Sequence, residues 1–281
     1  GLPLAAGEID AQLRRRQQGF GSGGRMRIED DRARLVGGVL NGHTTGAPIA
    51  LYIENRDWAN WRGRDVKPMT VPRPGHADLA GAIKYGHRDL RLSLERASAR
   101  ETAARVAVGA ICRRLLAELG VSVGGYVVQI GAVRASLPDD LPYPERFARA
   151  EENDVRCPDP AAAEAMHAVI RQAMAERDTL GGVFEVVALG LPPGLGSHVH
   201  WDRKLDALLL GALGSIPAIK GVEVGPAFSN AGRRGTEVHD EILVEEGHLL
   251  RATNRAGGLE GGVTTGQPLV RRGACARPFT P

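Results

Sequence analysis

Residues 181–192, GGVFEVVALGLP, predict a β-strand, and the elements around this strand decide the fold class. The apolar, β-branched run suits a buried strand, and Pro192 ends it because proline has no backbone N–H to donate to a sheet. A second strand is predicted by YVVQIGAV, residues 126–133. The fold class therefore depends on whether helices alternate strictly with such strands along the chain.

A helix is predicted between these two strands. Asp159 suits the N-cap position and Pro160 the first helical position, and the helix runs to about Glu176. Another helix is expected near the N-terminus, where Ile9 and Leu13 lie four residues apart and share one face.

A third helix is predicted from Ser98 to about Leu119. Ser98 and Glu101 match a capping box, in which each side chain accepts a hydrogen bond from the other residue's backbone. The apolar residues of this helix share one face, which we expect to be buried: Val108, Ile111, Leu115 and Leu119. A fourth helix is expected after Asp202 as its N-cap, with inward-facing Leu205, Leu208 and Leu209.

Further strands are predicted in groups rather than one at a time. They cover RARLVGGVL (32–40), APIALYIEN (47–55), GVEVG (221–225) and DEILVEEGHLLRATN (240–254). RMRIED (25–30) adds another, joined to the next by a turn at Asp30 and Asp31. Because the strands do not alternate strictly with helices, the sequence favours an α+β fold with antiparallel sheets over a parallel α/β fold.

The charge balance and the cysteines restrict the class of protein. With 36 basic and 33 acidic residues the net charge is +3, which does not by itself indicate binding to nucleic acid or to membrane. No apolar run approaches the ~20 residues of a membrane span. Three well-separated cysteines without a CxxC pair predict reduced thiols in a cytoplasmic protein.

The segment RPGHAD, residues 73–78, places His76 beside a rigid turn. A histidine titrates near neutral pH, so His76 could exchange a proton with a ligand, although lone histidines are more often structural or simply exposed. The His76–Asp78 spacing could also suit a metal. The segment SHVHWD, residues 197–202, offers no matching set of ligands, so no metal site is expected.

Several arginines are candidates for binding an anion. Arg14, Arg15 and Arg16 either stabilise the end of the first helix or capture a ligand with whichever side chain points inward. Arg73 adjoins the rigid turn, and Arg96 precedes the expected start of a helix at Ser98. Free backbone N–H groups at such a start favour a phosphate-bearing cofactor, although Ser98 could simply cap the helix.

A glycine-rich stretch, AGGLEGGVTTG at residues 256–266, has two interpretations. It is not a phosphate-binding P-loop, because no Gly-Lys-Ser/Thr follows. Its glycines could allow the backbone to approach a flat ligand, or they could form a hairpin with bulges.

Taken in order, the motifs of this chain resemble those of the chorismate synthase family. They include RRRQQGFGSGGRMRIEDD, GHTTGAPIALYIENRDW, RPGHAD, KYGHRD, ERASARETAARVAVGA, DTLGGVFEVVALGLPPGLGS, AIKGVEVG, GTEVHDE and TNRAGGLEGGVTTGQPLV. The segment ERASARET is similar to that of the actinobacterial and Gram-positive branch. The resemblance extends over nearly the whole chain.

The resemblance implies a fold of helices sandwiched between antiparallel sheets, a homotetramer and a cytoplasmic location. It implies a lyase of the shikimate pathway that converts 5-enolpyruvylshikimate 3-phosphate to chorismate and phosphate by 1,4-elimination. Reduced FMN is the implied cofactor, with NADPH as a candidate reductant. His76 would then donate a proton near the flavin, and Arg73 would meet a substrate anion.

The resemblance also assigns site residues one by one. Arg16 matches a substrate-binding arginine. FMN contacts are implied for Arg96, Ala97, Ser98, Pro217, Ala218, either Gly261 or Gly262, and for Arg277, Pro278 and Thr280. Arg277 to Thr280 are similar to a Lys-Pro-Ile-x-Thr segment with arginine for lysine.

Some positions depart from the family. Ser22 stands where a second loop arginine is usual, and Pro217 stands where glutamine is usual. The family's Gly-Glu-Ser-His-Gly motif and its terminal Arg-Ser-Asp segment are absent. We therefore expect one domain over residues 1–281 that lacks both ends. The alternative is a non-catalytic module that binds flavin or another anion; binding of nucleic acid is not expected, because no stacking face of aromatic and basic residues occurs.

Overall fold

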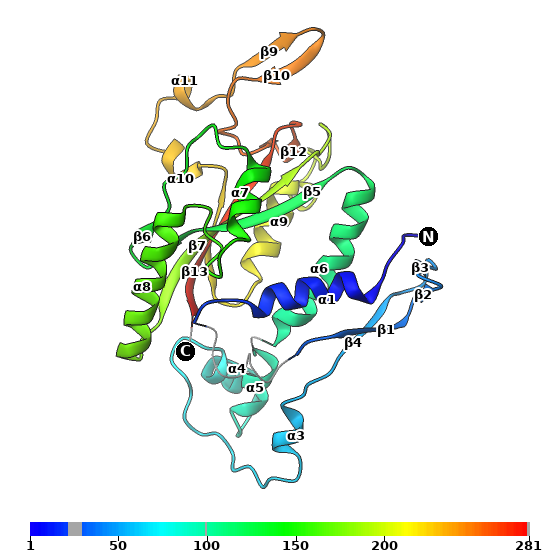
Figure 1. Cartoon of the computed structure of the whole chain (residues 1–281), viewed down its shortest axis with the longest axis vertical. Helices are drawn as coiled ribbons and strands as arrows, with labels where there is room; N and C mark the ends of the chain where they lie inside the picture. The colour runs from blue at the N-terminus through cyan, green and yellow to red at the C-terminus, as the bar shows by residue number, and fades with distance from the viewer. Residues whose placement is uncertain (22–29, 99, 280–281) are drawn as a thin grey trace. The chain divides into compact units, whose positions relative to one another are not determined.

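The computed structural model describes residues 1–21, 30–98 and 100–279, with side chains through Cys275. The chain divides into two compact units (Figure 1). Unit 1 comprises Gly1–Gln18 and Gly24–Arg114, and unit 2 comprises Gly19–Gly23 and Leu115–Pro281. The expectation of one domain truncated at both ends stays a prediction.

Unit 1 combines short helices with two small antiparallel sheets. Its elements are α1 (Ala6–Gln17), β1 (Ala33–Gly37), β2 (Val39–Leu40), β3 (His43–Thr44), β4 (Ala50–Ile53), α3 (Trp58–Trp61), α4 (Asp78–Tyr85), α5 (Arg91–Arg96) and most of α6 (Glu101–Glu118). Strand β1 pairs with β4, and β2 pairs with β3.

The core of unit 1 lies between α1, β1 and α6. Ile9 and Leu13 are fully buried, which confirms the predicted inner face of α1. They pack against alanines of α6, namely Ala103, Ala107 and Ala110. The predicted face of α6 is wrong for Val108, Leu115 and Leu119, which are exposed, whereas Ile111 packs partly buried against this core. Alanine side chains are small and let a helix approach its neighbours closely. The face of α6 that carries the alanines is therefore buried in place of the face that carries the larger apolar residues.

The segment before β1 differs from its prediction. The expected strand over residues 25–30 lies largely outside the described residues. The expected turn at Asp30 and Asp31 is not formed. Asp31 is instead buried in an ion pair with two arginines, because a buried carboxylate needs such partners.

Unit 2 is built on one sheet. Its elements are β5 (Ser122–Ile130), β6 (Val133–Arg134), α7 (Tyr143–Ala150), α8 (Pro160–Glu176), β7 (Leu180–Leu189), η1 (Trp201–Arg203), α9 (Leu205–Gly214), β8 (Ile219–Val224), α10 (Ala227–Asn230), α11 (Gly235–Val238), β9 (Ile242–Glu245), β10 (His248–Arg251), β11 (Leu259–Glu260), β12 (Val263–Thr264) and β13 (Leu269–Phe279).

The five strands of this sheet lie in the order β6-β5-β7-β13-β8, and every neighbouring pair is antiparallel. Strand β7 is central, and it confirms the strand that the sequence predicts in this segment. Strands β9 and β10 form a separate hairpin that projects from the sheet (Figure 1). The predicted α+β class with antiparallel sheets is therefore confirmed.

Helix α8 packs on the sheet and supplies the core of unit 2. The Asp159 side chain accepts hydrogen bonds from the backbone of Ala161 and Ala162, 3.0 and 3.1 Å long, so the predicted cap is confirmed. Met166 and Ile170 of α8 are buried against Ile130 of β5.

The predicted cap at Asp202 is wrong. Helix α9 begins at Leu205 after Lys204, and Asp202 lies in the short helix η1, where its carboxylate bonds the His200 ring at 2.8 Å. Leu208, expected inward, is exposed. Among the described residues, no helix is long and apolar enough to cross a bilayer.

Candidate functional site

The segment from Arg73 to His76 forms a rigid turn before α4. Gly75 has a φ of 69°, in the left-handed region that favours glycine. Just before it, the ring of Pro74 fixes the backbone φ angle of that residue. His76 is exposed, and its Nδ1 lies 3.0 Å from the backbone oxygen of Pro74. A carbonyl only accepts, so Nδ1 carries a proton and Nε2 is the nitrogen that can exchange one with a ligand.

Asp78 is the partner of Arg73, not of His76. The Arg73 guanidinium donates to both carboxylate oxygens, from Nε at 2.8 Å and Nη2 at 3.0 Å, and the Arg73 backbone N–H adds a third bond at 3.1 Å. These side-chain bonds from Arg73 lower the pKa of Asp78 from 3.8 to about 2. The carboxylate therefore stays charged and holds the turn against α4, while Nη1 of Arg73 bonds none of the described residues.

The turn and the first part of α4 line one shallow cavity of about 420 Å³. Its lining residues are Pro72, Arg73, Pro74, Gly75, His76, Leu79, Ala80 and Ile83. A cation and an imidazole thus lie beside apolar side chains, an arrangement that suits a flat, anionic ligand. The structure brings the predicted Arg73 and His76 together.

Arg96 ends helix α5, which packs on α4. A Cβ atom at Gly81 of α4 would lie 2.8 Å from the Ser93 hydroxyl of α5, so the two helices are in close contact. Arg96 is exposed and forms no ion pair with any described residue. Its guanidinium is therefore available to a ligand, as the sequence predicts.

The predicted capping box at Ser98 is wrong. Helix α6 begins at Glu101, and the Ser98 hydroxyl accepts a 3.2 Å hydrogen bond from the Arg100 backbone N–H. Serine hydroxyls bond nearby backbone in this way and compete with a helix cap. Ser98 thus shapes the turn that connects Arg96 to α6.

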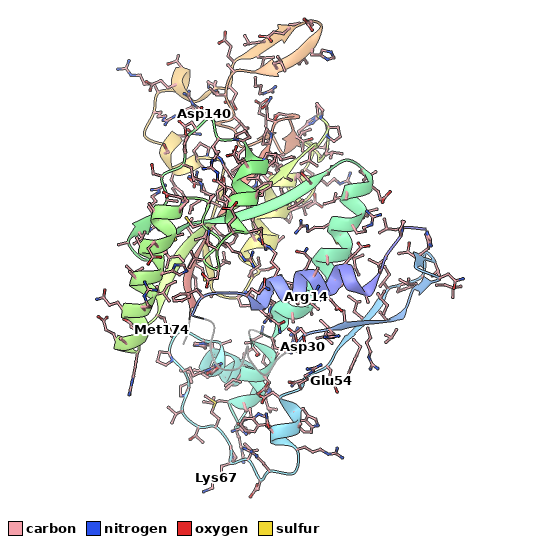
Figure 2. The ribbon with its side chains drawn as sticks, in the orientation of Figure 1. Arg14, Asp30, Glu54, Lys67, Asp140 and Met174 are labelled. Carbon is pink, nitrogen blue, oxygen red and sulfur yellow. The ribbon has the colours of Figure 1, made fainter. Side chains whose placement is uncertain are left out.

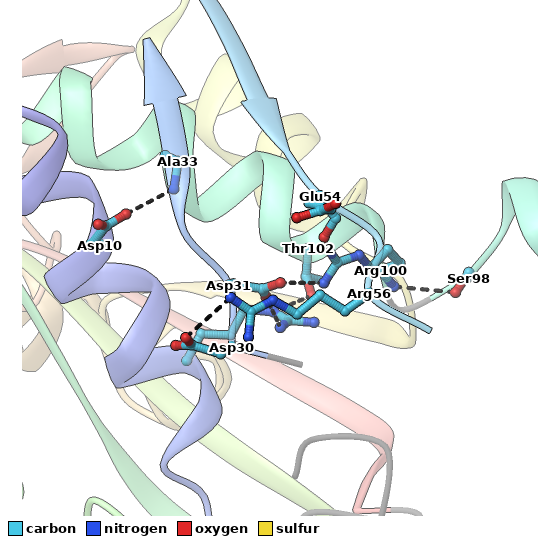
Figure 3. Close-up of polar contacts among 10 residues, drawn as sticks. Asp10, Asp30, Asp31, Ala33, Glu54, Arg56, Ser98, Arg100 and Thr102 are labelled. Carbon is cyan, nitrogen blue, oxygen red and sulfur yellow. Dashed lines mark hydrogen bonds and ion pairs between the residues drawn. The ribbon is translucent and has the colours of Figure 1, made fainter. Parts of the chain in front are cut away.

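Arg16 belongs to a second polar cluster in unit 1. Its Nε donates to Thr102 Oγ1 at 2.9 Å, and its Nη1 lies 3.3 Å from Oδ2 of Asp31. The other Asp31 oxygen pairs with Arg100, as Figure 3 shows. In contrast, Arg14 extends from the exposed side of α1 (Figure 2). Sequence reasoning missed Asp31 and Arg100, because no local pattern indicates which distant residues pair.

The predicted site residues of unit 2 lie on two loops. Pro217 and Ala218 connect α9 to β8, and Ala218 has an unusual φ of 70°. Gly261 and Gly262 form the turn of the β11–β12 hairpin, which confirms the hairpin interpretation. A Cβ at Gly262 would lie 2.7 Å from the Lys204 side chain, so this turn is tightly packed. Contact of these residues with flavin stays a prediction.

The remaining predicted positions carry no side-chain description. Arg277 and Pro278 lie on the backbone of β13, and their side chains are outside the described part. Thr280 and Ser22 lie outside the described residues altogether. Among the residues that are described, no three His, Cys, Asp or Glu side chains gather where they could hold a metal ion.

Comparison with known proteins identifies the relatives of this chain. The family model for chorismate synthase matches residues 1–280. A chorismate synthase of Symbiobacterium thermophilum is 55% identical, over 97% of this chain and 73% of its own length. The chorismate synthase of Aquifex aeolicus is 50% identical, over 96% and 72%. A crystal structure of chorismate synthase matches with a TM-score of 0.85 and 44% identity, over 99% of this chain and 77% of that one. The chain therefore belongs to the chorismate synthase family.

Proposed function

We propose that this chain catalyses the reaction of its family, the 1,4-elimination of phosphate from 5-enolpyruvylshikimate 3-phosphate to give chorismate with reduced FMN as cofactor. The observation that supports this most directly is the cavity at the turn before α4. There the Arg73 guanidinium and the exposed His76 ring lie together on one rigid segment.

The arginines match the charge of this substrate. A phosphate and two carboxylates require several guanidinium groups, which bind such anions with paired hydrogen bonds. Arg73 would contribute its Nη1, since its other nitrogens hold Asp78. Arg16 would contribute from α1, anchored by Thr102 and Asp31.

The chain also offers residues that fit FMN. Arg96 is an exposed cation beside the Ser98 turn and suits the cofactor's phosphate or its reduced, anionic ring. Reduced FMN, when bound, supplies an electron transiently and accepts a proton from the substrate. His76 would donate a proton from Nε2 and so stabilise negative charge on the cofactor. Because Nδ1 is held by Pro74, this donation requires the doubly protonated ring.

Anaerobic titration tests this proposal. The protein should bind reduced FMN and the substrate, and the absorbance of chorismate should then rise only when the flavin is reduced. The alternative, a non-catalytic module that binds flavin or another anion, requires binding without product. Failure to bind either FMN or the substrate anion would contradict both interpretations.

We further propose a homotetramer in the cytoplasm. Val108, Leu115 and Leu119 leave an apolar stripe exposed on α6, which subunit contacts would cover. The three cysteines are free thiols, as in a reducing compartment. Light scattering on the purified protein would measure the number of subunits.

A further inference from the structure

We propose that Asp31 is a positioning residue that holds the substrate-binding Arg16 and the flavin-binding segment Arg96–Ser98 in place together. This assignment rests on the proposed function. Asp31 touches neither ligand in this proposal and acts only through the residues that it binds.

Asp31 divides its carboxylate between two arginines from different parts of unit 1. Oδ2 lies 3.3 Å from Nη1 of Arg16 on α1, and Oδ1 pairs with Nη1 of Arg100 just before α6. The Asp31 side chain is 1% exposed, and those of Arg16 and Arg100 are 11% and 18% exposed. A buried carboxylate only accepts hydrogen bonds, so it fixes both guanidinium groups at once.

Arg100 connects Asp31 to Ser98 of the flavin-binding segment (Figure 3). Its side chain binds Asp31 and donates to the backbone oxygen of Glu54 at 2.7 Å. Its backbone N–H donates to the hydroxyl of Ser98 at 3.2 Å. The Ser98 side chain is therefore oriented by a residue whose own guanidinium is fixed by Asp31.

The chemistry of the position explains why a carboxylate is needed there. Asparagine has nearly the same volume, but Arg16 and Arg100 meet different carboxylate oxygens, so an amide would place its oxygen before one arginine and its N–H groups before the other. The two buried cations would also lose their neutralising charge. Arg16 and Arg100 would then adopt several orientations, and both ligands would have to order them on binding.

Two neighbouring aspartates provide matched controls, and both appear in Figure 3. Asp10 of α1 accepts a 2.8 Å hydrogen bond from the Ala33 backbone, so it joins α1 to β1 without contacting either arginine. Asp30 is half-exposed and pairs with Arg32 and Arg56 at 3.2 and 3.4 Å. Asp10→Asn tests the structural contribution of this region, and Asp30→Asn tests the loss of one negative charge.

The experiment measures binding without turnover, using oxidised FMN, which cannot supply the electron. FMN affinity is measured by flavin fluorescence and substrate affinity by calorimetry in the presence of FMN, with the urea midpoint as a stability readout. Asp31→Asn should weaken both ligands about 10- to 100-fold, as expected for one lost charge-assisted contact each. Asp10→Asn and Asp30→Asn should leave both affinities nearly unchanged, because neither carboxylate pairs with Arg16 or Arg100.

Each outcome decides the assignment. Unaltered protein that binds neither ligand refutes the proposed function and the role of Asp31 with it. Unaltered protein that binds both, with equal binding by Asp31→Asn, refutes the role of Asp31 alone. Equal losses in Asp31→Asn and Asp10→Asn reduce Asp31 to a structural residue and also overturn the assignment. Should Asp31→Asn not fold, Asp31→Glu keeps the charge and must still weaken both ligands at a near-normal urea midpoint.

Discussion

Units 1 and 2 differ in the size of the side chains that their helices bury and in where their apolar residues are exposed. In unit 2, large side chains such as Ile130, Met166 and Ile170 are buried between α8 and the sheet. In unit 1, the buried α6 residues are alanines, while Leu79 and Ile83 of α4 are exposed beside His76. Both units therefore bury a core, but in unit 1 an exposed apolar pair lies on the cavity beside His76, where a ligand can cover it.

The buried polar groups of the two units also differ in what they join. In unit 2, Glu185 accepts hydrogen bonds from Tyr126 and from Arg272, the latter at 2.6 Å. Burial raises the pKa of Tyr126, so its hydroxyl remains a donor. This network lies inside the sheet. In unit 1, the Asp31 cluster instead joins Arg16, which the proposed substrate would contact, to Arg100 beside the Ser98 turn.

The largest expected effect tests whether unit 1 carries the chemistry. His76→Ala should lower turnover about 10²- to 10⁴-fold, the usual contribution of a positioned proton donor, and leave FMN affinity intact. Anaerobic chorismate absorbance measures it. His248→Ala, on the hairpin of unit 2, is the control and should retain full turnover. A fully active His76→Ala protein would remove the residue from the mechanism.

Core truncation tests how much the large buried side chains of unit 2 contribute to stability. Met166→Ala should reduce the free energy of unfolding by about 2–5 kcal/mol, because it leaves a cavity in a closely packed core. Leu92→Ala, on the exposed side of α5, should change it by less than about 0.5 kcal/mol. Urea titration followed by circular dichroism compares the two. Equal losses would show that Leu92 is covered in the folded assembly and would weaken the contrast between the units.

The next prediction tests whether Arg96 of unit 1 contributes to cofactor binding. Arg96→Ala should weaken reduced-FMN binding by about 1.5–3 kcal/mol, the contribution of one charge-assisted contact. The fold should be unaffected, since Arg96 pairs with no described residue. Arg62→Ala removes an equally exposed arginine from a loop of the same unit and should bind FMN normally. Unchanged affinity in Arg96→Ala would exclude the residue from the flavin site.

The smallest effect is a change in acid stability. Asp78 has a folded pKa of about 2 against an ordinary value of 3.8, so its stabilising contribution is complete above about pH 4 and is lost as the pH falls towards 2. Solvent reaches the Arg73 side chain, so we expect about 1 kcal/mol or less. Acid titrations of Asp78→Asn and unaltered protein should show a shallower loss in the variant. Parallel curves would mean that other carboxylates dominate acid unfolding.

The sequence predicts best those elements that depend on local chemistry. The Asp159 cap, the strand over β7 and the glycine hairpin are of this kind, and all three are confirmed. The cap expected at Asp202, also in unit 2, is wrong. The start of α6 was mispredicted because the Ser98 hydroxyl bonds its own turn. Its buried face was mispredicted because packing selected alanines over larger residues. Of the site, the turn at Arg73 and His76 could be predicted, whereas the Asp31 pairing depends on contacts between residues 69 positions apart.

Two of the cysteines differ in their access to solvent, and this difference can be used to follow opening of the unit 2 core. Cys112 is exposed on α6 in unit 1, whereas Cys157 is buried in the core of unit 2, where burial raises the pKa of its thiol. A thiolate is the reactive form, so a thiol-specific dye should label Cys112 in the native protein and reach Cys157 only when that core opens. The labelling kinetics of Cys157 would therefore report opening of the unit 2 core, with the exposed Cys112 as a reference.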